Sequence, residues 1–499
     1  MKIEIEIETI PEPELDFGDG RMGIEPRRAM AAPRSSTRHP GRLRLGLVGA
    51  ESDVAATRAW LEGMDRFRPA RESNVARYRD WPGWRKALGS DLVIEDRFIR
   101  AMPDNQVLMG LQSATTSGGF DAFVQMYQER IQSLFRDDRP DCVVVCISEA
   151  IGDLRVENPG LSSVEREALR RLQAEEEGDQ LSLFAPTPEE LKAAEDLRMQ
   201  ADDLLFRTFY RALKARAMDH ANPVPLQVIR RDTVERADDK GQSHATRAWH
   251  LGVSLLYKSG QTPWRPADLP ANTCFVGISF HHLKRRSGGL VYASLAQAVS
   301  TEFEPFALSG ASIDQDQRRD RRPYLNEEQA RGLLEDILRE YEARAGVSPD
   351  RVIFHKTSKY EPEEIAGFQQ AAAGRVASCE LVWLRPTSFR LVRKGQQEPW
   401  RGTLCRVGGE TYLFTMGFMR WWREYPGPHI PAPVEIGTAG ATDLRERARE
   451  ILALTKMNWN SSEGVSRYPV TLSFAKKVGE IMAELSEGKS PNPSYRFYM

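Results

Sequence analysis

The sequence lacks most of the features that assign a function at first sight. Its 499 residues carry a formal net charge of −2, so total charge does not argue for a nucleic-acid partner. No apolar run reaches the length of a membrane span. Apolar and acidic residues alternate over residues 1–8, which predicts a strand and not a secretion signal. We therefore expect a cytoplasmic protein of roughly two to four domains.

Metal-binding and dinucleotide-binding motifs are also missing. Cys142 and Cys146 lie in one apolar run, but no second pair of Cys or His completes a zinc set. The five cysteines are expected to be free thiols, mostly buried, in a reducing compartment. The turn after the first buried strand has no G-x-G-x-x-G pattern, so a dinucleotide site is not supported.

The sequence does contain two series of apolar strands that alternate with helical segments. The first series predicts strands at 43–49, 141–147 and 225–231, and helices near 52–66, 119–136, 201–219 and 244–259. The second predicts strands near 273–280, 289–294, 302–308, 351–355, 380–384, 389–394 and 411–416, and helices near 326–345, 362–373, 441–457 and 470–485. Such alternation is typical of α/β layer architectures.

These patterns divide the chain into three parts. Residues 1–42 are predicted to form an N-terminal arm or linker that packs loosely on the body. Residues 43–268 form a first α/β domain, and residues 269–499 form a second. An acidic insertion at about 152–200 interrupts the first domain and is expected to face water.

Four residues of the first domain form a candidate phosphate-binding set. Tyr210 and Lys214 are four residues apart on a predicted helix and share one face. Gln227 lies at the edge of the following strand, and Lys258 lies near the end of the next helix. A phenol, an amide and two ammonium groups can converge as donors on one terminal phosphate. The residues alone also allow solvated lysines and a core tyrosine.

The order and spacing of these residues resemble the 5′-phosphate pocket of the MID domain of Argonaute proteins. The matching residues are Tyr210-x-x-x-Lys214, Gln227 and Leu255-Leu256-Tyr257-Lys258-Ser259-Gly260. The family pattern has a further lysine where this chain has Ser254. Prokaryotic members without that lysine often use a divalent ion, held partly by the C-terminal carboxylate. The resemblance therefore implies Mg²⁺ held by Gln227 and by an inward-turned Met499.

The second domain resembles a PIWI domain, which has an RNase H-like fold. The matching segments are 271–279, 349–357, the proline-rich 425–433 and 468–476. In nucleases of this type, three such segments carry carboxylates that hold two divalent metals; here the positions read Ser279, Thr357 and Lys476. Neutral hydroxyls are poor ligands and a lysine repels a cation, so guide-directed cleavage is not expected.

Basic residues of the second domain are candidates for contacts to a duplex backbone. They are Lys284, Arg285, Arg286, Lys356 and Arg390. Such contacts go to phosphates and read no sequence, which a guide supplies by base pairing. For any one of them taken alone, the residue type favours a solvated surface charge over a duplex contact.

The chain has no room for the PAZ and N domains of long Argonautes, so it resembles the short prokaryotic ones. The resemblance implies a guide, expected to be RNA, that captures complementary single-stranded DNA. It also implies a heterodimer with an APAZ-containing partner fused to a TIR, sirtuin-like or nuclease effector, acting in prokaryotic immunity. Two alternatives stay open: an endonuclease with atypical ligands near Asp314 and Asp316, and a scaffold that binds no nucleic acid.

Overall fold

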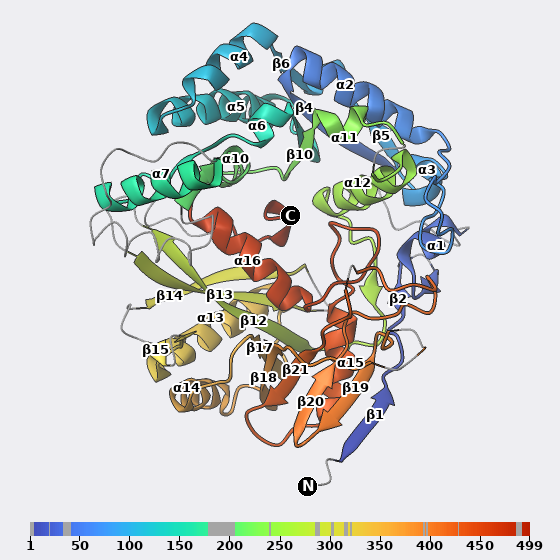
Figure 1. Cartoon of the computed structure of the whole chain (residues 1–499), viewed down its shortest axis with the longest axis vertical. Helices are drawn as coiled ribbons and strands as arrows, with labels where there is room; N and C mark the ends of the chain where they lie inside the picture. Colours follow the sequence, from blue (N-terminus) through green and yellow to red (C-terminus); the bar gives the residue numbers. More distant parts are fainter. Residues whose placement is uncertain are drawn as a thin grey trace.

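Two β-sheets, one parallel and one mixed, organise the molecule (Figure 1). The structure is a computed structural model. It describes residues 4–18, 20–32, 41–177, 205–238, 241–284, 290–300, 304–313, 318–319, 322–392, 395, 398–427, 429–485 and 492–499. Within this part of the chain, every helix is too short or too polar to span a bilayer.

The first sheet is parallel throughout and has the order β10-β7-β4-β5, with β6 also paired to β4. Its strands are β4 (Arg42–Ala50), β5 (Asp91–Val93), β6 (Ile99–Met102), β7 (Cys142–Ile147) and β10 (Leu226–Arg230). Every residue of β7 is buried, as expected for a central parallel strand covered on both faces.

Helices cover both faces of this sheet, which makes the domain Rossmann-like. Helices α5 (Ser117–Asp137) and α10 (Phe209–Met218) pack on one face. Helices α2 (Glu51–Glu62) and α12 (His244–Lys258) pack on the other. Strand β9 (Phe206–Thr208), which pairs with β8 (Arg155–Glu157), interrupts the helix predicted at 201–219, so that α10 begins at Phe209; residues 201–204 lie outside the described part of the chain.

The second sheet is mixed and has the order β1-β19-β20-β21-β18-β17-β12-β13-β14. Three antiparallel strands, β12 (Thr273–Lys284), β13 (Leu290–Val299) and β14 (Phe306–Ile313), precede the parallel β17 (Arg351–Lys356) and β18 (Ser378–Pro386). The remaining strands are β1 (Ile5–Thr9), β19 (Thr403–Val407), β20 (Glu410–Leu413) and β21 (Val434–Thr438). This arrangement is RNase H-like.

Two pairs of helices enclose the mixed sheet. Helices α13 (Glu327–Ala345) and α14 (Pro362–Ala372) share a core with one face. Helices α15 (Leu444–Leu454) and α16 (Val470–Met482) pack on the other face, and α16 lies between the two sheets in Figure 1. The strand predicted at 389–394 is wrong, because residues 389–392 are irregular. The sequence did not predict β19 and β21, because both strands are short and adjoin glycine or proline.

The predicted loose arm is also wrong, because residues 4–32 are built into the body. Strand β1 is the edge strand of the mixed sheet. Strands β2 (Leu15–Asp16) and β3 (Met22–Gly23) form a small sheet with β11 (Arg265–Pro266). Glu12 is buried between Arg401 Nε at 2.9 Å and Lys456 Nζ at 2.8 Å. Paired acidic and basic groups therefore hold this segment in place.

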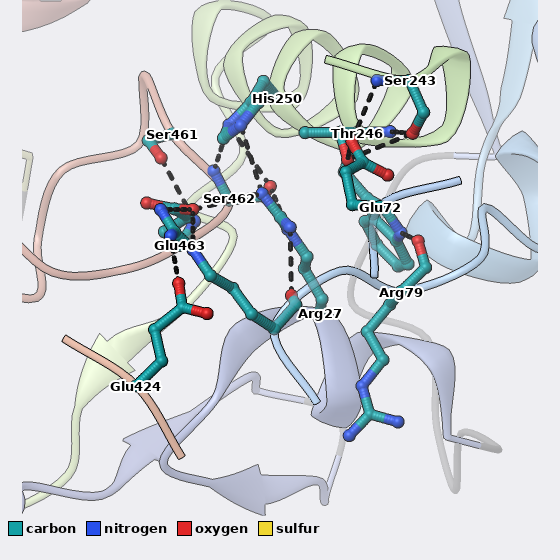
Figure 2. Close-up of polar contacts among 12 residues, drawn as sticks. Arg27, Glu72, Arg79, Ser243, Thr246, His250, Glu424, Ser461, Ser462 and Glu463 are labelled. Atoms are coloured by element: carbon teal, nitrogen blue, oxygen red, sulfur yellow. Dashed lines mark hydrogen bonds and ion pairs between the residues drawn. The ribbon is translucent and has the colours of Figure 1, made fainter. Parts of the chain in front are cut away.

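Helix α1 (Pro26–Ala31) adds a second buried attachment of the N-terminal segment. Arg27 donates from Nε to Ser462 Oγ at 2.8 Å, and its Nη2 lies 3.1 Å from His250 Nε2 on α12 (Figure 2). Burial, with the charge of Arg27, lowers the pKa of His250 to about 3, so the imidazole is neutral. Arg27 therefore joins residues that lie far apart in the sequence.

Candidate functional site

The predicted phosphate-binding residues meet between the two sheets, where α10, β10, α12 and the last residues of the sequence come together (Figure 1). Helix α10 begins at a side-chain cap, in which Thr208 Oγ1 accepts from Arg211 N at 3.4 Å. Helix α12 begins in the same way at Ser243, whose Oγ accepts from Thr246 N at 3.3 Å. These caps fix where the helices start and so where Lys214 and Lys258 project.

Hydrogen bonds link four of the predicted residues in two pairs. Lys258 Nζ donates to Gln227 Oε1 at 2.6 Å. Lys214 Nζ donates to the main-chain oxygen of Met499, which is buried. The Lys214 ammonium also lies 4.6 Å from the centre of the Tyr210 ring. The structure thus brings together all four predicted residues and the last residue of the sequence.

Two buried cations dominate the electrostatics of this site. Lys214 and Lys258 are 1% and 2% exposed, and no carboxylate side chain of the described residues pairs with either. Burial, with the charge of Lys477, lowers the pKa of Lys214 to about 7. Burial, then the charge of Lys214, lowers the pKa of Lys258 well below its ordinary value. An anion between them would offset that penalty for both ammonium groups.

The remaining polar groups orient the site. Ser254 Oγ donates to Gln227 Oε1 at 3.0 Å, so this amide oxygen accepts from both Ser254 and Lys258. Tyr210 is 37% exposed, which leaves part of its ring open to solvent or to a ligand. The site therefore has donors inside and an aromatic group at its margin.

Lys477 on α16 is a part of this site that the sequence did not predict. Its charge lowers the pKa of Lys214 and, with a smaller effect, that of Lys258. It belongs to the second domain, 219 residues beyond Lys258 in the numbering. The sequence does show two adjacent lysines, Lys476 and Lys477, on a predicted helix. Only Lys476 matched a motif, so Lys477 was not assigned to the site.

The two residues predicted to hold magnesium each accept a hydrogen bond from a lysine. Gln227 Oε1 accepts from Lys258, and the main-chain oxygen of Met499 accepts from Lys214. Mg²⁺ prefers hard oxygen ligands, and both atoms are of that kind. As the site stands, however, two ammonium groups occupy these oxygens, and this arrangement fits an anion and not a cation.

The three positions that the sequence predicts to be degenerate catalytic ones lie around β12, β17 and α16. Ile278 on β12 pairs with Lys356 on β17, so Ser279 and Thr357 follow at the next position along the two parallel strands. A Cβ at Gly277 would lie 1.9 Å from Thr471 O, so α16 can approach β12 only because this residue is glycine. Lys476 lies on α16, and its side chain is outside the described part of the structure.

Acidic, histidine and cysteine side chains do not cluster in the part of the chain that the structure describes. It contains no group of three or more His, Cys, Asp or Glu side chains suited to a metal. His355 is fully buried with Nδ1 2.9 Å from Thr471 Oγ1, and burial lowers the pKa of this imidazole to about 3. Asp314 and Asp316 lie outside the described residues.

The predicted duplex contacts need one correction. Lys356 is buried, and its Nζ lies 2.6 Å from both carboxylate oxygens of Glu364 on α14, so it cannot reach a nucleic acid backbone. Arg390 is exposed and its Nη1 donates to Phe389 O at 2.9 Å, which leaves it available. The side chain of Lys284, and all of Arg285 and Arg286, lie outside the described residues.

No protein-family model and no curated protein sequence matches the chain. Solved structures of Argonaute proteins do match in fold. Clostridium butyricum Argonaute, bound to a guide DNA and a 19-mer target DNA, superposes with a TM-score of 0.61 and 13% identity, over 98% of this chain and 54% of the other. Drosophila Piwi (TM-score 0.56, 12% identity) and A. aeolicus Argonaute (0.55, 13%) match over 99% and 98% of this chain and 56% of each of theirs.

These likenesses establish an Argonaute-like fold. The parallel sheet corresponds to a Rossmann-like MID domain, and the mixed sheet corresponds to an RNase H-like PIWI domain, as predicted. The chain spans a little over half the length of the Argonautes it resembles.

Proposed function

We propose that this chain is a guide-binding, non-cleaving Argonaute-like subunit that anchors the 5′ phosphate of a small guide. The observation that carries the proposal is the pair of buried cations, Lys214 and Lys258, which have no carboxylate side chain as partner among the described residues. A buried charge is normally paired with an opposite one, so two buried lysines that lack a carboxylate side chain as partner favour an anionic ligand.

A terminal phosphate suits this site better than an internal one. A 5′ monophosphate carries close to two negative charges at pH 7, which matches two ammonium groups. Gln227 can add a neutral hydrogen bond, and the exposed part of the Tyr210 ring can stack on the first base. Loss of one charge-assisted contact should cost roughly 1.5–3 kcal/mol of binding.

Guide binding is tested by comparing guides that differ only at the 5′ end. A 5′-phosphorylated RNA should bind far more tightly than the same RNA with a 5′ hydroxyl. Lys214→Ala and Lys258→Ala should each weaken binding of the phosphorylated guide by roughly 10- to 150-fold, which is the cost above expressed as a ratio. Lys86→Ala removes an exposed lysine elsewhere and serves as the matched control. Equal affinities for the two guides would favour the scaffold alternative.

The absence of cleavage is proposed from Ser279, Thr357 and Lys476, which replace the carboxylates of a two-metal site. Incubation with guide, labelled complementary DNA and Mn²⁺ should give no product. A product that disappears in Asp314→Asn or Asp316→Asn would support the alternative, a guide-directed endonuclease with atypical ligands.

Magnesium at the guide phosphate remains a further proposal. It requires the ammonium groups of Lys214 and Lys258 to leave the oxygens of Met499 and Gln227, because each occupies a position that a metal would need. The affinity for a phosphorylated guide should then fall when EDTA replaces Mg²⁺, with no such change for the hydroxylated guide. Equal loss for both guides would indicate general charge screening.

We also propose that the guide is RNA, that the target is single-stranded DNA, and that an APAZ-containing effector chain completes the assembly in prokaryotic immunity. This part rests on the resemblance to short Argonautes. Sequencing the nucleic acid that co-purifies with the chain, together with the polypeptide bound to it, tests all three points.

A further inference from the structure

The two edges of the nine-stranded sheet differ in how they are covered. At one edge, β14 is shielded by the end of the chain, since Ala307 N–H donates to Pro493 O at 2.9 Å and Phe306 forms a bridge with Ser494. At the other edge, the outer side of β1 has no strand partner among the described residues. β1 extends along this free edge at the bottom of Figure 1.

The register of β1 shows which of its backbone groups are free. Ile5 to Thr9 pair with Val407 to Thr403, and Ile10 N–H continues this register with a hydrogen bond to Gly402 O at 2.8 Å. In an antiparallel pair, alternate residues direct their N–H and C=O to the partner. The even-numbered residues therefore face β19, and Ile5, Ile7 and Thr9 direct their backbone groups outward.

One face of this strand is apolar and uncovered. Ile5 and Ile7 are 56% and 55% exposed. Ile7 also lines a groove of about 410 Å³ that continues over Val392, which is 67% exposed, and Trp400. An exposed strand edge is normally protected by charged residues, above all lysine, by proline or by a bulge, and β1 has charged residues of one sign only. Residues 4–9 contain no lysine or proline, and the register of β1 has no bulge.

The opposite face of β1 is acidic. Glu6 and Glu8 pair with Arg406 at 3.2 and 3.4 Å, and Glu8 also pairs with Arg445 at 2.8 Å. Glu6 nevertheless remains 62% exposed, and Glu4 next to it is exposed. Charged neighbours on one face of a sheet attract opposite charges and repel like ones.

We propose that β1 is a docking edge for an extended segment of a partner polypeptide in which basic and apolar residues alternate. The segment adds a tenth strand through the outward backbone groups of Ile5, Ile7 and Thr9. Its apolar residues cover Ile5, Ile7 and the groove, and its basic residues lie beside Glu4, Glu6 and Glu8. A second copy of β1 fits worse, because it would bring glutamates beside glutamates. The proposal does not depend on guide binding.

A blocked, fluorescent peptide of alternating lysine and valine tests the edge by anisotropy at physiological salt. The wild-type chain should bind it, and the same peptide with glutamate in place of lysine should bind at least tenfold more weakly. Ile7→Pro should also weaken binding at least tenfold, since it removes an outward N–H and leaves the β1–β19 bonds intact. Ile7→Lys, which places a positive charge on the apolar face, should also weaken binding of the lysine peptide, whereas its matched control Val347→Lys, at another exposed apolar residue, should not.

Each outcome decides for or against the docking edge. Equal binding of the lysine peptide to wild type and Ile7→Pro, or no binding at all, would overturn the proposal. Dimerisation of the wild type that Ile7→Pro abolishes, seen by sedimentation velocity, would also overturn it, because the occupant would then be a second copy. Binding of the 5′-phosphorylated guide should stay unchanged in Ile7→Pro, which shows that the variant is folded and separates the two proposals.

Discussion

Two kinds of buried lysine occur in this molecule: those that contact a glutamate side chain and those that do not. Lys356 in the mixed sheet and Lys456 near α15 are fully buried, and each contacts a buried glutamate, Glu364 or Glu12. Lys214 and Lys258 are buried to the same degree, yet their hydrogen bonds go to a main-chain oxygen and an amide. Burial alone therefore does not mark a binding site. Burial with no carboxylate side chain as partner is what favours the phosphate site proposed above.

Breaking a paired lysine should have the largest effect on stability. Glu364→Gln removes the countercharge of Lys356 and weakens the acceptor for Leu325 N at 3.1 Å. An uncompensated buried charge costs about 3–5 kcal/mol, so the free energy of unfolding in urea should fall by that amount. Glu363→Gln, one residue earlier on α14 and in a partly exposed ion pair with Arg319, should lower the free energy of unfolding by only a small fraction of that amount. If Glu364→Gln lowered the free energy of unfolding no more than Glu363→Gln does, the pairing of Lys356 with a glutamate would not stabilise the fold.

The pH dependence of guide binding should show the unpaired character of Lys214. Its pKa in the free protein is about 7, because burial and the charge of Lys477 disfavour the ammonium form. A bound phosphate restores the charged form, so binding takes up a proton and affinity falls as pH rises above 7. The Kd for a phosphorylated guide should rise by about tenfold per pH unit from pH 7 to 9.

Two controls make this pH test specific. The 5′-hydroxyl guide should show no such trend, since it brings no terminal phosphate to the lysine. Lys214→Arg should flatten the curve, because an arginine keeps its charge over this range. A slope that persists in Lys214→Arg would assign the proton to another group.

Removing an unpaired lysine should have a smaller effect on stability and the opposite sign. Lys258→Met keeps the length of the side chain and removes a buried charge whose pKa is already well below normal. The free protein should melt at the same or a slightly higher temperature, while its affinity for a phosphorylated guide falls by roughly 10- to 150-fold. A drop in melting temperature as large as that of Glu364→Gln would show that Lys258 has a structural role.

The sequence predicted the fold, and it placed on neighbouring elements the four candidate residues that the structure brings together, because both leave local signals. Apolar runs identified β7, β12 and β17, and a four-residue spacing placed Tyr210 and Lys214 on one helix face. The failures concern long-range pairing. Lys356 is the last residue of an apolar strand, a position at which a side chain often reaches solvent. Its burial depends on its contact with Glu364 on α14, which the sequence alone does not show. Lys477 reaches the site from another domain, which no local pattern could predict.

The N-terminal segment shows the same limit. Its alternation predicted a strand, but the polar, proline-rich residues that follow suggested an arm. The partner strand β19 lies about 400 residues away, and its own sequence was too short to be recognised. Edge pairing of this kind depends on tertiary structure more than on strand propensity.

The smallest expected effect concerns Ser254, which stands where the family pattern has a lysine. Its hydroxyl donates to Gln227 Oε1 at 3.0 Å, and this oxygen keeps the shorter bond from Lys258 when Ser254 is removed. A neutral hydrogen bond contributes about 0.5–1.5 kcal/mol, so Ser254→Ala should weaken binding of a phosphorylated guide by about two- to tenfold. Ser259→Ala, whose hydroxyl bonds only to Leu256 O of its own helix at 2.7 Å, should leave binding unchanged. If Ser254→Ala weakened binding as much as Lys258→Ala, the Ser254 hydroxyl would have to contact the phosphate itself. Lys214 and Lys258 would then not be sufficient to hold the guide.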